Sequence, residues 1–94
     1  SGRGIYLYRC SNIALTIEKN SLTNYRQGMF IYKCSGLTDI SSNNVSNALY
    51  GILVEYTSNT RIASNELNNV YYGIGAYCGS NYTVEGNTVK RKVY

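Results

Sequence analysis

The stretch GMFIYKCS, residues Gly28–Ser35, decides the fold because nearly the same phrase, GIYLYRCS, occupies Gly4–Ser11. Two further glycines open related phrases, GILVEYTS at Gly51 and GIGAYCGS at Gly73. The four glycines lie 24, 23 and 22 residues apart. Self-similarity at such a period is the signature of an architecture built by stacking one structural unit. The 94 residues are therefore predicted to form one domain of four units, or rungs, starting near residues 4, 28, 51 and 73.

Three other positions recur in step with the glycines. Each unit has an asparagine, an aliphatic residue three positions before it and another aliphatic residue two positions after it. The asparagines are Asn20, Asn43, Asn65 and Asn87; the preceding residues are Ile17, Ile40, Ile62 and Val84, and the following residues are Leu22, Val45, Leu67 and Val89. Equivalent residues in a stacked repeat lie above one another, so each set predicts a column that runs through all four rungs.

Each unit divides into three short runs of alternating apolar residues, bounded by Gly, Ser or Asn. Runs of this length with β-branched and aromatic residues indicate strands and are too short for amphipathic helices. The bounding residues are those that turn chains. Three strands and three turns in 22 to 24 residues describe one rung of a solenoid, in which each strand pairs in parallel with its copies above and below. The predicted class is all-β.

The asparagines suit the turns of such a rung. Asn tolerates left-handed backbone angles, and its amide can donate a hydrogen bond to the next rung while its oxygen accepts one from the previous rung. The residues Asn20, Asn43, Asn65 and Asn87 are expected to form a ladder inside one turn. A second, shorter ladder is expected at Asn24, Asn47 and Asn69, interrupted at Arg91.

The pattern G-I-x-[LIVA]-Y-x-x-S, followed by I-x-x-N-x-[LV]-x-N, resembles the parallel β-helix repeat of pectate-lyase-like proteins over residues 4–94. That superfamily includes polysaccharide lyases, glycosidases, mannuronan epimerases, NosD-like proteins and phage tailspikes. The resemblance implies a right-handed, single-stranded parallel β-helix of about four rungs. It also implies a location outside the cell or on a cell or virion surface, but it does not select one activity, because one scaffold hosts many functions.

The composition indicates which classes of binding partner to expect. The net charge of +4 and the pI near 9.0 favour anionic partners such as acidic glycans or phosphates, although an ordinary solvated surface also explains them. No apolar run approaches the roughly 20 residues that a membrane span needs, so no membrane partner is expected. The only basic run, Lys90–Lys92, lies at the chain end, whereas nucleic-acid binding calls for a continuous basic stripe. Nucleic acid is therefore not an expected partner.

Strand alternation sorts the first run of each unit into two faces. The inward face is aliphatic: Ile5, Met29, Ile52 and Ile74 in one column, and Leu7, Ile31, Val54 and Ala76 in the next. The outward face carries Tyr6, Phe30, Leu53 and Gly75 in one column, and Tyr8, Tyr32, Glu55 and Tyr77 in the next. Only the inward residues are required by a stacked core.

The outward face is the candidate binding surface. In the resembled family the first sheet and its loops form the glycan cleft, and flat tyrosine rings suit sugar faces. Arg9 and Lys33 lie just beyond the tyrosines, where they could pair with uronate or sulfate groups. The predicted binding residues are Tyr6, Tyr8, Arg9, Phe30, Tyr32, Lys33, Glu55 and Tyr77. Two alternatives stay open: the aromatic columns stabilise the sheet by stacking, or they pack against another subunit.

Catalysis by this segment is not expected. Glycoside hydrolysis needs two carboxylates flanking one bond, and only Glu55 of the five acidic residues falls on the outward face. The Asp cluster with which pectate lyases hold calcium is absent from the sequence, so calcium enters by family resemblance alone. A lyase needs a base and a group that neutralises the carboxylate; Lys33 and Arg9, with Tyr32 as acid, are weak candidates for a minimal polysaccharide lyase.

Sulfur chemistry offers little for a metal. Cys10, Cys34 and Cys78 are expected to be free, buried thiols that behave as small hydrophobes. The sequence has no His and a single Met, so a zinc site lacks ligands. NosD-like relatives are linked to copper, but a soft site would need Cys10, Cys34 and Met29 to converge, and two of these fall on predicted core positions. No metal site is predicted.

The expected function is a non-catalytic segment of a carbohydrate-active β-helix protein, which recognises an acidic polysaccharide or serves as scaffold. The alternative is a spike, fibre or adhesin stalk whose aromatic face packs on a partner chain. Solenoids carry capping elements because their end rungs expose the core, and neither end of this sequence has room for one. The chain is therefore expected to adjoin further β-helix rungs or to self-associate through its ends.

Overall fold

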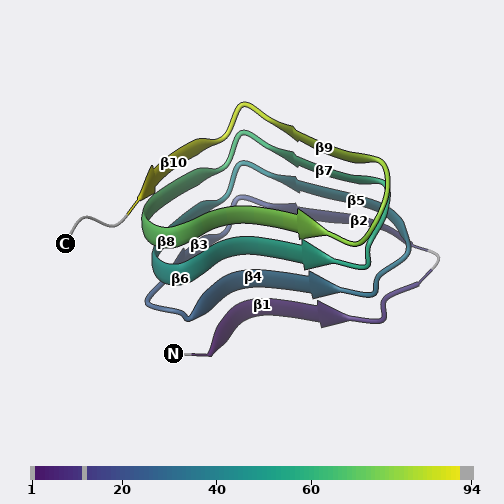
Figure 1. Ribbon diagram of the computed structural model, residues 1–94, viewed down its shortest axis with the longest axis horizontal. Helices are drawn as coiled ribbons and strands as arrows, with labels where there is room; N and C mark the ends of the chain where they lie inside the picture. Colours follow the sequence, from purple (N-terminus) through teal and green to yellow (C-terminus); the bar gives the residue numbers. More distant parts are fainter. Residues whose placement is uncertain (1, 12, 92–94) are drawn as a thin grey trace.

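The chain is a parallel β-solenoid of about four turns, shown as a computed structural model in Figure 1, which describes residues 2–11 and 13–91. The described residues form two sheets and no helix, so none of them belongs to a helix that could cross a membrane. One sheet, here the front sheet, contains β1 (Arg3–Tyr8), β4 (Gln27–Tyr32), β6 (Asn44–Glu55), β8 (Glu66–Tyr77) and β10 (Thr88–Arg91), with β3 (Ser21–Thr23) also paired to β6. The other, the back sheet, contains β2 (Ile13–Glu18), β5 (Gly36–Ser41), β7 (Thr60–Ala63) and β9 (Tyr82–Glu85).

The strand register confirms the repeat alignment. Every strand pair in the two sheets is parallel, and each strand pairs with its copy one rung away. Ile5 pairs with Met29, Met29 with Ile52, and Ile52 with Ile74. The columns at Ile17 and Leu22 are in register in the same way through all four rungs.

The structure differs from the prediction of three separate strands per rung. In β6 and β8, which are 12 residues each, the third run of one rung continues into the first run of the next. Only β3 and β4 are separated at this point. The register skips Asn47 and Asn69, both of which adopt left-handed angles (φ 54° and 56°), so the bend is made within a continuous strand.

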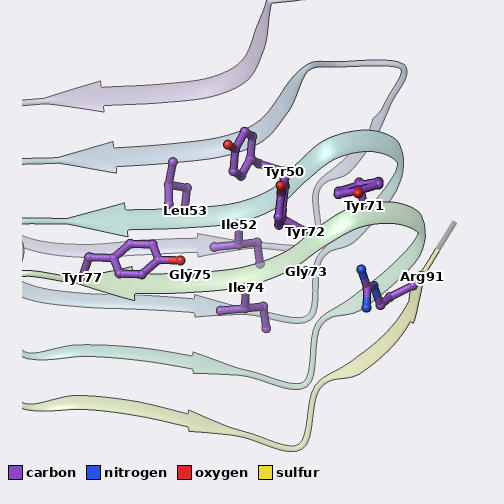
Figure 2. Close-up of a pocket in the computed structure, with 10 residues that line it drawn as sticks. All are labelled: Tyr50, Ile52, Leu53, Tyr71, Tyr72, Gly73, Ile74, Gly75, Tyr77 and Arg91. Carbon is purple, nitrogen blue, oxygen red and sulfur yellow. The ribbon is translucent and has the colours of Figure 1, made fainter.

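The predicted inward columns form the core. Met29, Ile31, Ile40, Val45 and Val54 have no exposed surface. Neighbouring strands alternate in step, with Ile52 and Ile74 on one side of the front sheet and Leu53 on the other (Figure 2). Aliphatic columns continuous through the rungs are thus what holds the two sheets together.

Burial falls off in the fourth rung. Val84 is 50% exposed and Val89 is 40% exposed, whereas Ile62 and Leu67, their partners one rung back, are fully buried. Both valines belong to inward columns, so the described part of the chain leaves its core cross-section open on this side.

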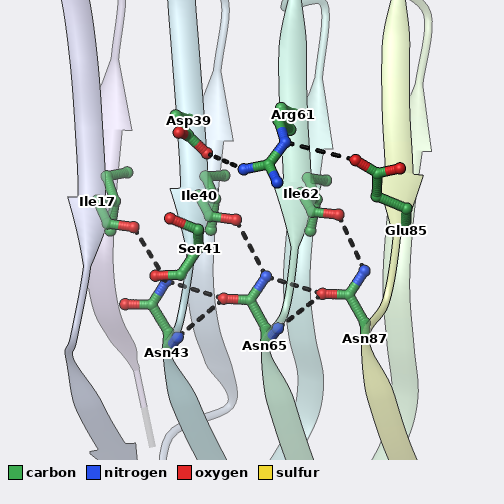
Figure 3. Close-up of polar contacts among 10 residues, drawn as sticks. All are labelled: Ile17, Asp39, Ile40, Ser41, Asn43, Arg61, Ile62, Asn65, Glu85 and Asn87. Atoms are coloured by element: carbon green, nitrogen blue, oxygen red, sulfur yellow. Dashed lines mark hydrogen bonds and ion pairs between the residues drawn. The ribbon is translucent and has the colours of Figure 1, made fainter.

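The predicted inner asparagine ladder is present (Figure 3). The side-chain Nδ2 of Asn43 donates to the Oδ1 of Asn65 at 2.9 Å, and Asn65 donates to Asn87 at 2.9 Å. The backbone N–H of each asparagine donates to the same oxygen, at 3.0 Å from Asn43 and 2.9 Å from Asn65. Each Nδ2 also donates to a backbone carbonyl of the previous rung; from Asn65 this carbonyl is that of Ile40, at 3.0 Å.

The ladder satisfies polar groups inside the protein. Asn43 and Asn65 are each 2% exposed, and every buried side-chain nitrogen and oxygen among the described residues has a partner. A buried amide without partners would cost about 1–3 kcal/mol, so the ladder stabilises the turn only as a complete set.

The backbone of the inner ladder corrects one expectation. The left-handed residue of this turn is the one before each asparagine: Lys19, Ser42, Ser64 and Gly86, with φ between 56° and 64°. This placement reverses the chain one residue early, so the asparagine side chain points inward toward the carbonyls at the strand end. The outer ladder does use left-handed asparagines at Asn24, Asn47 and Asn69, and Asn69 donates to Asn47 at 2.5 Å.

The repeated glycines are required by close approach. A Cβ on Gly51 would lie 2.6 Å from the carbonyl oxygen of Gly73 and 2.9 Å from Cδ1 of Leu67. A Cβ on Gly28 would lie 2.5 Å from Val45. At this point the front strand runs directly against the core aliphatic column, and only glycine leaves the room.

We predict that Asn65→Ala lowers the free energy of unfolding by about 3–5 kcal/mol, because it removes the acceptor of the buried Asn43 backbone N–H, the side-chain donor to the Ile40 carbonyl and one of the three acceptors of the Asn43 side-chain amide. Asn69→Gly is the matched control: it removes an exposed ladder amide and accepts the left-handed angle, so about 1 kcal/mol or less is expected. Urea denaturation measures both. Equal losses would contradict the special role of the inner ladder.

We predict that Gly51→Ala destabilises the protein by about 1–3 kcal/mol, because the new methyl group meets a backbone carbonyl that cannot move aside. At Gly75 a Cβ would meet only the side chains of Tyr77 and Leu53, so Gly75→Ala is expected to stay within about 0.5 kcal/mol of the parent. Thermal unfolding followed by circular dichroism compares the two, and a tolerated Gly51→Ala would refute the close-approach explanation.

Candidate functional site

Four aromatic rings cover the outer surface of β1 and β4. Tyr6 lies 5.4 Å from Phe30 between ring centroids, and Tyr8 lies 5.6 Å from Tyr32. Within each strand the rings are 6.3 Å and 5.4 Å apart. Their planes differ by only 12° to 26°, so the four rings form a near-parallel array. The predicted outward columns are therefore confirmed in the first two rungs.

Three cations lie against these rings. The Arg3 guanidinium is 4.4 Å from the Tyr6 centroid and 5.4 Å from that of Phe30. Arg9 lies 5.2 Å from Tyr8, in the strand that it follows. Such contacts between a cation and a ring face are attractive by about 0.5–1 kcal/mol at exposed positions.

Arg9 and Lys33 owe their positions to the turn that ends each front strand. Both adopt left-handed angles (φ 58° and 56°), and their backbone N–H groups donate to carbonyls of the next rung. The turn directs both side chains back along the ring columns, with the Lys33 Nζ 5.3 Å from the Tyr32 centroid. The sequence prediction that these two cations flank the tyrosines is confirmed in position.

The array includes two residues that the sequence did not single out. Tyr56 occupies the turn position of Arg9 and Lys33 one rung further, and its ring meets Tyr32 edge-on at 5.8 Å. Arg3 precedes the first repeat glycine and pairs in register with Gln27. Tyr56 could have been predicted from the sequence, because it aligns with Arg9 and Lys33 in the repeat. Arg3 could not, because the residues aligned with it in the other rungs carry no positive charge. We call this set the aromatic face: Arg3, Tyr6, Tyr8, Arg9, Phe30, Tyr32, Lys33 and Tyr56.

The aromatic face presents ring edges and hydroxyls more than ring planes. Tyr6 and Tyr8 are 43% and 47% exposed, whereas Phe30, beneath them in the array, is 9% exposed. Neighbouring rings and the Arg3 guanidinium cover part of each plane. A ligand on this face therefore meets phenol hydroxyls, ring edges and positive charge together.

Glu55 and Tyr77 do not join the array, although they lie in the Tyr8 column by register. Glu55 is half-buried and forms no ion pair within the part of the chain that the structure describes. Tyr77 leans over Gly75, two rungs away from Tyr32, because glycine leaves room there. Glu55 thus lies beside Tyr32 without a ring of its own, and Tyr77 lies apart from the four-ring array.

The predicted catalytic candidates come together, but as stacked partners. The Lys33 ammonium lies over the Tyr32 ring, 5.3 Å from its centroid, and this cation–π contact stabilises the array. On the back sheet, Asp39 and Glu85 both pair with Arg61, at 3.2 Å and 3.5 Å (Figure 3).

The three thiols differ from one another. Cys34 is buried, and burial raises the pKa of its thiol above the ordinary value, so it stays neutral. Cys10 is half-buried and packs against the core. Cys78 is exposed, which corrects the expectation of three buried thiols; it occupies the turn position of Tyr56 one rung on, where side chains face solvent. The side-chain hydrogen bond with Cys78 raises the pKa of Tyr56.

A family model described as "Periplasmic copper-binding protein (NosD)" matches residues 1–94. No curated protein and no solved structure matches the chain. The described residues contain no group of three His, Cys, Asp or Glu side chains that could hold a metal ion. Of the soft donors, Met29 and Cys34 are enclosed in the core, while Cys78 lies on the surface at another rung. The donor set of these rungs therefore does not fit a copper centre.

The family description places its members in the periplasm, which is compatible with the extracellular or surface location that the family resemblance implies. The family match over the whole sequence agrees with the stacked parallel rungs and the asparagine ladder. The chain belongs to the NosD family of right-handed β-helix proteins, described as periplasmic copper-binding proteins.

Proposed function

We propose that this chain is a non-catalytic binding segment of a NosD-type β-helix and that the aromatic face holds an acidic polysaccharide. The observation that carries the proposal is the joint presence of a four-ring array and three cations on one face. Arg3, Arg9 and Lys33 form no ion pair within residues 2–11 and 13–91, so their charge is available to an anion.

The chemistry of the face favours a glycan over a purely apolar partner. The exposed Tyr6 and Tyr8 present hydroxyls that hydrogen-bond to sugar hydroxyls, and ring edges that contact sugar C–H groups. Guanidinium groups recognise carboxylates and sulfates in a bidentate manner. An extended polymer would lie across successive strands, where equivalent groups recur about every 4.8 Å.

Charge also predicts how such binding responds to conditions. Exposed charges are screened within about 8 Å at physiological ionic strength, so affinity for an acidic polymer falls as salt is added. A neutral polymer would lose little. Salt dependence therefore separates recognition of charge from simple ring packing.

A scaffold role is the second candidate, and a separate observation favours it. Val84 and Val89 expose core-column side chains in the fourth rung, next to fully buried partners. Further rungs of the same solenoid, or the end of another copy, would cover them. In that case the aromatic face stabilises the sheet through ring stacking, and this segment links neighbouring parts of the assembly.

We predict that acidic polysaccharides such as polygalacturonate retard the protein in affinity electrophoresis, and that neutral dextran does not. Tyr8→Ala and Lys33→Gln should each weaken the retardation by about ten-fold, since each removes a ring or charge contact worth about 1–2 kcal/mol. Raising the salt concentration should weaken it further.

Two control variants lie on other surfaces. Leu37→Ala removes an exposed apolar side chain, 65% exposed on the back sheet, and Lys19→Gln removes one positive charge from a distant turn. Both should bind like the parent protein. Retardation that is equal in all variants, or absent with every polymer, would refute glycan binding by the aromatic face and leave the scaffold role.

A further inference from the structure

A pocket lies on the outer surface of the front sheet, two rungs away from the centre of the aromatic face. Its volume is about 270 Å³, and it lies above the middle of β8 (Figure 2). Its main lining residues are Tyr50, Tyr71, Tyr72, Gly75, Tyr77 and Arg91. None of these except Tyr77 was a predicted binding residue.

The pocket exists because one outward column ends in glycine. The column Tyr6, Phe30, Leu53 and Gly75 carries large side chains in three rungs and none in the fourth. A Cβ on Gly75 would fall 2.6 Å from the Tyr77 ring and 3.1 Å from Cδ1 of Leu53. The Tyr77 ring therefore takes part of the space of the missing side chain, and the pocket opens beside it.

Tyrosines form the walls. Tyr50 and Tyr72 stack at 4.9 Å with planes 18° apart, and Tyr71 meets Tyr72 edge-on at 4.7 Å. Tyr72 and Tyr77, on either side of the pocket, are 50% and 56% exposed. The walls therefore combine flat apolar surface with phenol hydroxyls that reach solvent.

A single cation completes the lining. Arg91 pairs with Val70 after a register shift between Lys90 and Arg91, although the repeat spacing aligns it with Asn69. Irregularities of this kind re-aim a side chain, and here the guanidinium lies 5.8 Å from the Tyr71 centroid. Arg91 forms no ion pair among the described residues, so the pocket has one positive charge for a ligand to neutralise.

We propose that this pocket binds a single carboxylate-bearing sugar ring, a hexuronate, with the carboxylate on Arg91 and the ring against Tyr72. The volume is at the small end for ligand pockets and suits one six-membered ring. The carboxylate pairs with the Arg91 guanidinium, and the sugar hydroxyls hydrogen-bond to the exposed phenols of Tyr72 and Tyr77, which the ring of an aromatic acid cannot do. The inference rests on the proposed recognition of acidic glycans, and it assigns a separate site for one residue of such a chain.

The test is a titration of the 94-residue protein with D-galacturonate, followed by amide shifts in ¹H–¹⁵N NMR spectra. The expected result is saturable shifts at Gly73, Gly75 and Tyr77. Arg91→Gln should weaken binding at least about ten-fold, and Gly75→Leu, which refills the column as Leu53 does, should abolish it. Lys19→Gln, which removes an equal charge elsewhere, should bind like the parent.

D-Galactose and benzoate separate the contributions of charge and hydroxyls. Both should bind at least about ten-fold more weakly than galacturonate. Absence of shifts around Gly75, or equal binding of benzoate, would overturn the assignment. If Gly75→Leu does not fold, Arg91→Gln alone decides the matter, because its side chain lies on the surface and its loss leaves the core intact.

The two proposals fail in different ways. If the polymer still binds and is weakened by Tyr8→Ala but galacturonate leaves Gly75 unaffected, the pocket assignment is wrong and the aromatic face stands. If neither polymer nor monosaccharide binds, both are wrong.

Discussion

The structure depends on one buried interaction, the head-to-tail hydrogen bonding of Asn43, Asn65 and Asn87. Each asparagine places an amide where the chain reverses, and the amides of Asn43 and Asn65 lie in a part of the turn that water does not reach. Its side-chain oxygen accepts hydrogen bonds from the preceding asparagine of the ladder. Its side-chain amide donates to the carbonyl at the end of the preceding back strand. Because these bonds join equivalent residues, they fix the register of every rung to the next. That register also positions the aliphatic columns, the close contact of the repeated glycines with the core, and the outward rings.

Much of the fold could be predicted from the sequence because stacking imposes the same requirement on every rung. The register, the inward columns and the inner ladder each depend on side chains that recur at one spacing, and that spacing can be identified in the amino-acid sequence. The backbone conformation of the turns is harder to predict from the sequence. The left-handed position falls on Lys19, Ser42, Ser64 and Gly86, four residues with no common side-chain chemistry, so composition did not reveal it. The fusion of two runs into β6 was hidden because a bend within a strand and a turn use the same residues.

The candidate site was predicted in part, for a related reason. Tyr6, Tyr8, Phe30 and Tyr32 were identifiable because they interrupt a pattern that the core alone would not require. Arg91 was aligned with the asparagines, and only the structure shows the shift in pairing that brings it beside Tyr71. The sequence did not predict the pocket because the pocket lies where Gly75 has no side chain. In the sequence, Gly75 indicates only that the outward column of large side chains ends at the third rung. The family description names copper, yet the described residues contain no group of three His, Cys, Asp or Glu side chains that could hold a metal ion.

The asparagine ladder also gives the solenoid a direction. Each amide donates toward the following rung and accepts from the preceding one, so the ladder is polar in the way that a row of aligned dipoles is polar. Among the described residues, Asn20 has a side-chain oxygen without a donor at one extreme, and Asn87 has an amide directed onward at the other. A rung added beyond Asn87 must offer an oxygen, and one added before Asn20 must offer an N–H. Two like ends brought together would set oxygen against oxygen or donor against donor. A rung that continues the inner ladder must therefore face the same way as the rungs before it.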